Sequence, residues 1–247
     1  MDNTKNSRVL WAAIERIALY VVAVITPLVL SAVLRPQTID NFACELSRSF
    51  ALLAFSILSL QFVVSARFKW IERPFGLDMI FRFHKAMGVF AAALLIVHPI
   101  LFAAGKDWSL LLSNSRYILL AKIGLLILLI LASISIFRLV IKFEYEKWRS
   151  FHNIIAAPVL LIGFLHSWNL GSDVTKIPMR VLWIGMLGMA VLAYLYHRML
   201  RPLWHRRHVY RVIETRKETP NVWTVKFAPP PRTIPFHQAV PRRRPAG

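Results

Sequence analysis

The sequence predicts an all-α membrane protein: a bundle of six transmembrane helices followed by a short C-terminal segment resembling a β-hairpin. The 247-residue chain is 57% hydrophobic and only 17% charged, which is too apolar for a soluble domain of this size. Apolar runs of about 20 residues, the length that a helix needs to cross a bilayer, recur along most of the chain. Because lipid offers no partner for backbone polar groups, each run is expected to be a helix.

The six spans are bounded by basic, proline and polar residues that interrupt the apolar runs. The first run follows Lys5, Arg8 and Arg16 and is longer than the apolar core of a signal peptide, so we treat it as an uncleaved span. The expected spans are residues 10–34, 46–66, 79–104, 117–141, 150–170 and 179–200. The expected organisation is an N-terminal segment 1–9, a membrane domain 10–201 and a tail 202–247.

Basic residues set the expected orientation of the bundle. The net charge of +19 would indicate nucleic-acid binding in a soluble protein. Here Lys and Arg concentrate at the N-terminus, in 67–85, in 138–149 and after Tyr196, which all fall on one side of the predicted bundle. Basic loops stay in the cytoplasm. We therefore expect a multi-pass protein of the plasma (inner) membrane with both termini cytoplasmic and no nucleic-acid partner.

The chemistry-bearing residues inside the spans are histidines. A single cysteine, Cys44, excludes an internal disulfide and a cysteine-rich metal cluster, and the chain has no glycine-rich nucleotide loop. The third span holds His84 and His98, and the fifth holds His152 and His166, in both cases fourteen residues apart. Fourteen helical steps return to within about 40° of the starting face, so the two imidazoles of one span share a face and lie roughly 21 Å apart along the axis.

The third and fifth spans cross the membrane in the same direction, which pairs the histidines by depth. His84 and His152 fall near the cytoplasmic side, and His98 and His166 near the outer side. Two neutral imidazoles can hold one iron between them, so we interpret the four residues as axial ligands of two stacked b-type haems. With imidazole on both faces no axial position is open, which favours electron transfer over oxygen binding.

Other residues near the histidines fit a porphyrin, although each also has an ordinary explanation. Small residues, which equally serve close helix packing, lie where a porphyrin would sit: Gly88, Ala156, Gly163 and 91–93. Three basic residues stand beside the inner pair: Arg82, Lys85 and Arg149. These cations could hold haem propionates by charge-assisted bonds, although basic residues are expected on this side in any case.

The tail after the last span has a different residue pattern from the spans. HVYRVIE (208–214) and VWTVKF (222–227) alternate like strands, and 217–221 contains the turn-forming pair Pro220-Asn221. The Pro- and Arg-rich end, PRRRPAG, is typical of a disordered segment.

The stretches RFHKAMGVFAAALLIVHP and FHNIIAAPVLLIGFLH resemble the ferric reductase-like transmembrane domain shared by ferric reductases and NADPH oxidases. The resemblance covers about residues 10 to 200. It implies a six-helix oxidoreductase with two b-type haems, which passes electrons from a cytoplasmic flavin and NAD(P)H donor to an acceptor outside. His84, His98, His152 and His166 match the family's ligand pattern one for one.

The tail resembles the opening strands of the FAD-binding barrel that follows the membrane domain in such reductases. FHQA resembles the approach to the barrel's next strand, but AVPRRRPAG does not continue it. The sequence stops before the barrel's flavin-contacting motif and before a nicotinamide domain. We therefore expect a truncated, frameshifted or split product that binds neither FAD nor NAD(P)H itself and takes electrons from a separate cytoplasmic flavoprotein.

Two alternative functions stay open at the level of the sequence. One is a haem-binding membrane subunit that works with a soluble partner, as in the periplasmic methionine sulfoxide reductase system. The other is a proton or metal transporter, which would need carboxylates deep in the spans, whereas Glu15, Glu45 and Asp78 lie at span ends. The acceptor, whether a ferric chelate, oxygen, a quinone or a protein, is equally open. Three residues of the outer side are candidates for an acceptor pocket: Trp108, Arg116 and Trp168.

Overall fold

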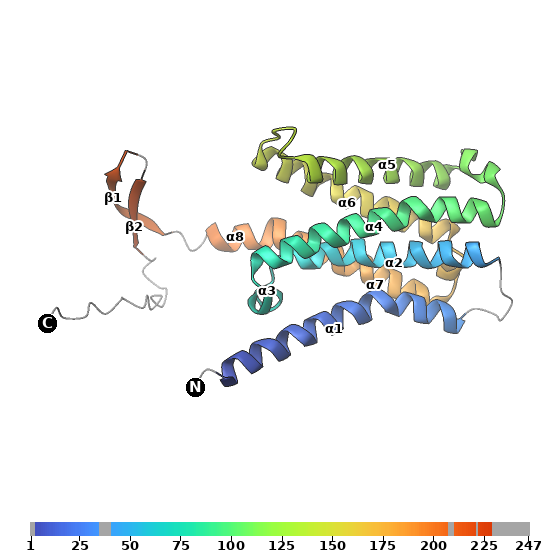
Figure 1. The fold of residues 1–247 in the computed structure, drawn as a ribbon, viewed down its shortest axis with the longest axis horizontal. Coiled ribbons are helices and arrows are strands. Elements are labelled where there is room, and N and C mark those ends of the chain that lie inside the picture. Colours follow the sequence, from blue (N-terminus) through green and yellow to red (C-terminus); the bar gives the residue numbers. More distant parts are fainter. Residues whose placement is uncertain (1–2, 35–40, 207–209, 221, 229–247) are drawn as a thin grey trace. The chain divides into compact units, whose positions relative to one another are not determined.

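The computed structural model describes residues 3–34, 41–206, 210–220 and 222–228. The chain forms two compact units, Met1–Leu195 and Tyr196–Gly247. The first is a bundle of long helices, and the second contains a pair of strands (Figure 1).

Six helices of the described residues are long and apolar enough to cross a membrane. The first five are α1 (Asn3–Leu34), α2 (Phe42–Ser65), α4 (Leu77–Gly105), α5 (Arg116–Phe137) and α6 (Tyr145–Leu170). The sixth candidate span, Ile177–Trp204, begins with α7 (Ile177–Leu195) and includes a π-helical turn, η3 (Tyr196–Leu200), and part of α8 (Arg201–Arg206). The predicted multi-pass bundle of six helices is confirmed, with boundaries shifted by a few residues.

One connection differs from the sequence prediction. The basic loop and turn expected after residue 66 contain a short helix, α3 (Lys69–Phe75), which begins after Arg67 at φ 57° and ends at Gly76 at φ 76°. Pro74 suggested a turn, but it lies inside the helix, and Arg16 of α1 donates to the carbonyl of Trp70, which has no partner from the proline. The fourth span also ends earlier than expected, at Phe137, because the chain turns through Lys142 at φ 50°.

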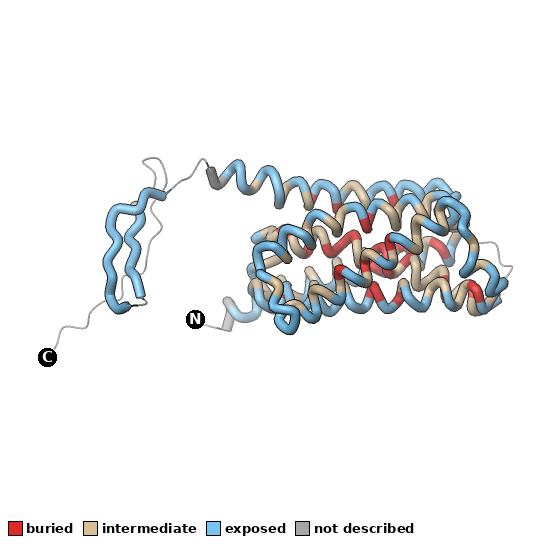
Figure 2. Tube along the Cα trace, turned by 90° about the horizontal axis from the view of Figure 1, so that it is seen from above, coloured by how far each residue is buried: buried red, intermediate tan, exposed pale blue. Residues whose placement is uncertain are grey.

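The core of the first unit is built around α2, the most buried of the spans. Figure 2 shows the buried positions gathered along the middle of the bundle. On one side of α2, Leu52 and Phe55 pack with residues of α6 and α7, among them Trp183. On another side, α2 packs against Ala91 and Leu94 of α4. This packing fixes the position of α4 against α2.

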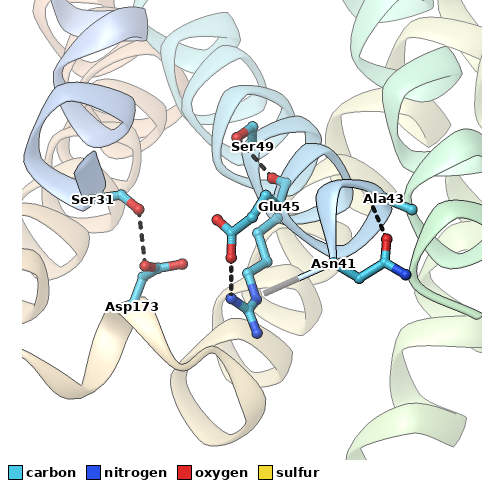
Figure 3. Close-up of polar contacts among 7 residues, drawn as sticks. Ser31, Asn41, Ala43, Glu45, Ser49 and Asp173 are labelled. Atoms are coloured by element: carbon cyan, nitrogen blue, oxygen red, sulfur yellow. Dashed lines mark hydrogen bonds and ion pairs between the residues drawn. The ribbon is translucent and has the colours of Figure 1, made fainter. Parts of the chain in front are cut away.

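Polar contacts fix the loop end of the bundle. The hydroxyl of Ser31 donates to Asp173 at 2.9 Å, and Asp173 begins the short helix η2 (Asp173–Thr175) (Figure 3). Asn41 accepts from the amide of Ala43 at 3.0 Å and caps α2. In the loop after α4, hydrogen bonds from the hydroxyl and amide of Ser109 lower the pKa of Asp107, which caps η1 (Trp108–Leu112).

The second unit contains an antiparallel pair, β1 (Arg211–Thr219) and β2 (Val222–Ala228). A hairpin is therefore present, but β1 starts after residue 208 and runs through 217–219, where a turn was expected. Cross-strand contacts explain the extension: Lys226 pairs with Glu214 at 2.5 Å, and Lys217 lies 5.7 Å from the ring centre of Trp223. Several sequence predictions lie outside the described residues: the end of the first span at Arg35-Pro36, the turn residue Asn221, the FHQA stretch and the PRRRPAG tail.

Candidate functional site

The structure brings the four histidines of the spans together in two pairs. The ring centres of His84 and His152 are 6.1 Å apart with the ring planes at 67°. Those of His98 and His166 are 6.5 Å apart at 78°. The early histidine of α4 meets the early histidine of α6, and the late one meets the late one, so the two helices run in the same direction. The pairing expected from the fourteen-residue spacing is present, while the role of these residues as ligands stays a prediction.

Hydrogen bonds fix the tautomer of both histidines in the outer pair. Nδ1 of His98 lies 3.0 Å from the carbonyl oxygen of Ser47, and Nδ1 of His166 lies 3.1 Å from the carbonyl oxygen of Tyr117. A carbonyl oxygen only accepts, so each Nδ1 carries the proton and donates. The neutral ring then keeps its free lone pair on Nε2, which is the nitrogen available to a metal.

The inner pair is held less symmetrically. The Ser135 hydroxyl donates to the carbonyl of Leu131 at 2.7 Å and accepts from Nε1 of Trp148 at 3.2 Å. Because the hydroxyl proton of Ser135 is already donated to Leu131, Ser135 Oγ can only accept from Nδ1 of His152, 3.4 Å away. The partner histidine, His84, has a buried Nδ1 with no hydrogen-bond partner among the described residues. This nitrogen is therefore a buried polar atom that no described residue satisfies.

The donor set fits a metal that receives its remaining ligands from another molecule. Two metal–nitrogen bonds of about 2 Å, plus about 1 Å from each Nε2 to its ring centre, place two trans imidazoles about 6 Å apart. Both observed separations, 6.1 and 6.5 Å, match this value. Among the described residues, no group of three His, Cys, Asp or Glu side chains is close enough to hold a metal ion. The described residues therefore contain no metal site made of protein ligands alone. Two imidazoles per level instead suit iron in a planar macrocycle.

The small residues near the histidines fall into two classes. A Cβ added at Gly88 would meet nothing within 4 Å, and one at Gly163 would meet only Phe55, at 3.7 Å. Ala91, by contrast, packs against α2, and Ala92 packs with Leu128 of α5 and Val159 of α6. The glycines therefore leave space beside the histidines, whereas these two alanines serve ordinary helix packing. Ala92 and its partners also form an apolar layer at a depth between the two histidine pairs.

The spacing of α4 and α6 is consistent with a group between them. Helix α4 packs closely on α2 and α5, and α6 packs closely on α5, where Gly124 faces Ile162. No comparable backbone contact joins α4 to α6. The two helices that carry the histidines are thus held apart by their neighbours, and the imidazoles reach across the space between them.

The three cations expected to hold propionates are exposed, and one is already paired. Arg82 and Lys85 lie on the first turns of α4, beside His84. Arg149 forms an ion pair with Glu146 at 2.7 Å and lies 5.7 Å from the ring centre of Tyr145. The proposed contact of these residues with propionates stays a prediction.

The candidates for an acceptor pocket are not brought together. Trp108 is 59% exposed in η1, and Arg116 is exposed at the start of α5. Trp168 stacks on Phe164 at 5.3 Å and lies beneath the guanidinium of Arg180 at 5.0 Å. Within the described part of the chain, no ring or polar contact joins Trp108, Arg116 and Trp168.

The sequence reasoning missed the residues that orient the rings. Ser47, Tyr117 and Ser135 come from α2 and α5, and the histidine spacing carries no information about those helices. A signal was available for the serines: a hydroxyl inside an apolar span usually either bonds its own helix or holds a polar partner on a neighbouring one.

Gly88 provides a test of the space beside the inner pair. Because a Cβ added there meets nothing from the neighbouring helices within 4 Å, the Gly88→Leu variant is expected to fold with unchanged or slightly higher thermal stability in the haem-free form. The same leucine would occupy space one turn from His84, so bound haem should fall by at least about half. Haem per chain and the thermal transition of the haem-free protein measure the two effects. Equal haem content in variant and wild type would show that no ligand occupies this space.

The comparison with known proteins agrees with this geometry. The family model described as "Ferric reductase like transmembrane component" matches residues 50–164. The matched segment is similar to a ferric reductase-like transmembrane domain. It includes most of α2 through most of α6 and three of the four histidines, and His166 lies two residues beyond the match. The resemblance found in the sequence is thus confirmed over the centre of the bundle.

The chain also has a distant relative among curated proteins. The chain is 25% identical over 147 residues to an uncharacterized protein of Archaeoglobus fulgidus, covering 55% of this chain and 80% of that protein. The relative is consistent with the family and adds no activity to it.

Proposed function

We propose that this protein carries electrons across the membrane through two b-type haems, one held by His84 and His152 and the other by His98 and His166. The observation that carries the proposal is the pair of imidazole–imidazole separations, 6.1 and 6.5 Å, at two levels of co-directional helices. The family match at residues 50–164 supports transmembrane electron transfer in general terms, without identifying the ligands.

The residues of the chain have separable roles in this proposal. Each of the four imidazoles provides Nε2 as the ligand atom. Ser47, Tyr117 and Ser135 accept hydrogen bonds from Nδ1 of three of these rings, which fixes ring orientation and raises the basicity of the ligand nitrogen. Arg82, Lys85 and Arg149 attract propionates at the inner level. The layer around Ala92 excludes water between the levels. Bound haem would supply a one-electron couple at each level, with both axial positions taken.

The direction of transfer follows from the distribution of charge. Basic residues gather at one end of the spans, which we assign to the cytoplasm of a plasma (inner) membrane, with both termini on that side. Electrons would enter there from a flavin-containing donor using NAD(P)H and leave at the His98 and His166 level to an acceptor outside. In this scheme residues 1–9 and 202–247 are cytoplasmic, and 10–201 form the membrane domain.

The proposal is tested with the purified full chain in liposomes. Ferricyanide is trapped inside, and dithionite is added outside as the reductant. Wild-type protein should reduce the trapped ferricyanide many times faster than protein-free liposomes. The His84→Ala/His98→Ala variant should not exceed the protein-free rate, whereas His208→Ala, which removes an imidazole outside the spans, should match wild type. Equal rates for wild type and the double variant would contradict transfer through the histidine pairs.

A further inference from the structure

A basic groove lies between the start of α1 and the short helix α3, and no histidine is among its lining residues. These two elements contact each other, and Figure 1 shows α3 beside the N-terminal part of α1. The groove has a volume of about 360 Å³. Its polar lining comes from four cations and one indole: Arg8, Arg16, Lys69, Arg73 and Trp70. No carboxylate is among its lining residues.

One of the four cations bonds across the groove and connects its two helices, and the other three line it. Arg16 donates to the carbonyl of Trp70 at 3.0 Å, bonds Glu15 at 3.2 Å and stands 4.5 Å from the Trp70 ring centre. It thereby joins α1 to α3 and is itself paired with a carboxylate. Arg8, Lys69 and Arg73 form no ion pair with any residue that the structure describes. Three uncompensated cations on two helices attract an anion.

The surface that continues from the groove is apolar. Val9, Leu10 and Trp11 on α1 are 51%, 61% and 68% exposed, and Ile14 in the next turn is 46% exposed. Trp70, at 50% exposed, has the amphipathic side chain that gathers at the headgroup level of a bilayer. A cationic end followed by an exposed apolar path matches a molecule with an anionic head and hydrocarbon chains.

We infer that this groove binds the headgroup phosphate of an anionic phospholipid, with the acyl chains lying along the exposed face of α1. Basic pockets between spans on the positively charged side of a membrane protein recognise such headgroups. An acidic protein surface would use the cations but not the apolar path, which favours the lipid. The inference does not depend on haem binding or on electron transfer.

The test uses the purified full chain in detergent, with bound lipid counted by native mass spectrometry. Phosphatidylglycerol and phosphatidylcholine are added at equal concentration. The pocket variant is Lys69→Gln/Arg73→Gln, and the charge-matched control is Lys142→Gln/Lys147→Gln, which removes one cation from the connection between α5 and α6 and one from the first turn of α6. Wild type and control should retain the anionic lipid with a preference of about tenfold, which the pocket variant should lose. Equal thermal transitions of the three proteins show that all are folded.

Three results would overturn the inference. The first is an equal preference for the two lipids in wild type, and the second is a preserved preference in the pocket variant. The third is displacement of the lipid by glycerol phosphate at millimolar concentration, because the site would then bind a free phosphate. If the pocket variant retains lipid but is reduced more slowly by a flavoprotein donor, the groove is a protein-docking surface, which also contradicts the lipid assignment.

Discussion

The His98→Ala variant is expected to bind one haem per chain where wild type binds two. Removing His98 leaves His166 as a lone axial donor at the outer level, and a single imidazole holds haem weakly. The inner pair should keep its haem, because the packed layer of Ala92, Leu128 and Val159 lies between the two levels. Haem content, measured as the pyridine adduct and divided by protein concentration, checks the result.

Matched variants make this prediction specific. His84→Ala should likewise retain one haem, and His84→Ala/His98→Ala should retain none. His208→Ala should retain both, since this histidine lies outside the spans. If His98→Ala bound two haems, or if His84→Ala lost both while remaining folded, the assignment of one independent haem to each pair would be wrong.

The Trp183→Ala variant is expected to lose about 3–5 kcal/mol of stability. Trp183 is 1% exposed, stacks on Phe55 with ring centres 4.7 Å apart and donates from Nε1 to Ser167 Oγ at 2.7 Å. It therefore joins α7 to both α2 and α6, and its removal leaves a cavity and takes away the donor to Ser167 Oγ, whose own proton stays bonded to the carbonyl of Phe164. Unfolding in mixed detergent and dodecyl sulfate, followed by tryptophan fluorescence, measures the change.

Two further substitutions separate packing from the hydrogen bond. Trp183→Phe keeps a ring against Phe55 but loses the bond to Ser167, so about 1 kcal/mol should be lost in addition to a smaller packing term. Trp108→Ala, at an exposed position of η1, should leave stability unchanged. A Trp183→Ala variant as stable as wild type would show that α7 is not held at this contact.

The histidine pairs were predictable because helical geometry fixes both the angle and the depth of residues fourteen apart. His84 meets His152, and His98 meets His166, as that arithmetic requires. The acceptors of the Nδ1 protons were not predictable, since the contact of Ser47 with His98 depends on how α2 packs on α4. Periodicity within one helix does not contain that information.

Other differences between sequence and structure have similar causes. Gly88 and Ala91 are equally small and only three positions apart, yet one faces open space and the other packs against α2. Residue size alone does not distinguish the two positions, because whether a small residue is packed or open depends on which face of α4 the neighbouring helix covers. The helix α3 was missed because Pro74 and Gly76 are typical of a turn, although a donor from another helix, Arg16, satisfies the carbonyl that Pro74 cannot bond. The extension of β1 depends on partners in β2, such as Trp223 opposite Lys217.

The most direct test of the central proposal is the spectrum and haem content of the purified full-length chain from haem-sufficient cells. Two low-spin b-type haems per chain are expected, reducible by dithionite, with both axial positions held by imidazole. Haem-free protein, or high-spin haem with one open axial position, would contradict the proposal that the two histidine pairs hold iron.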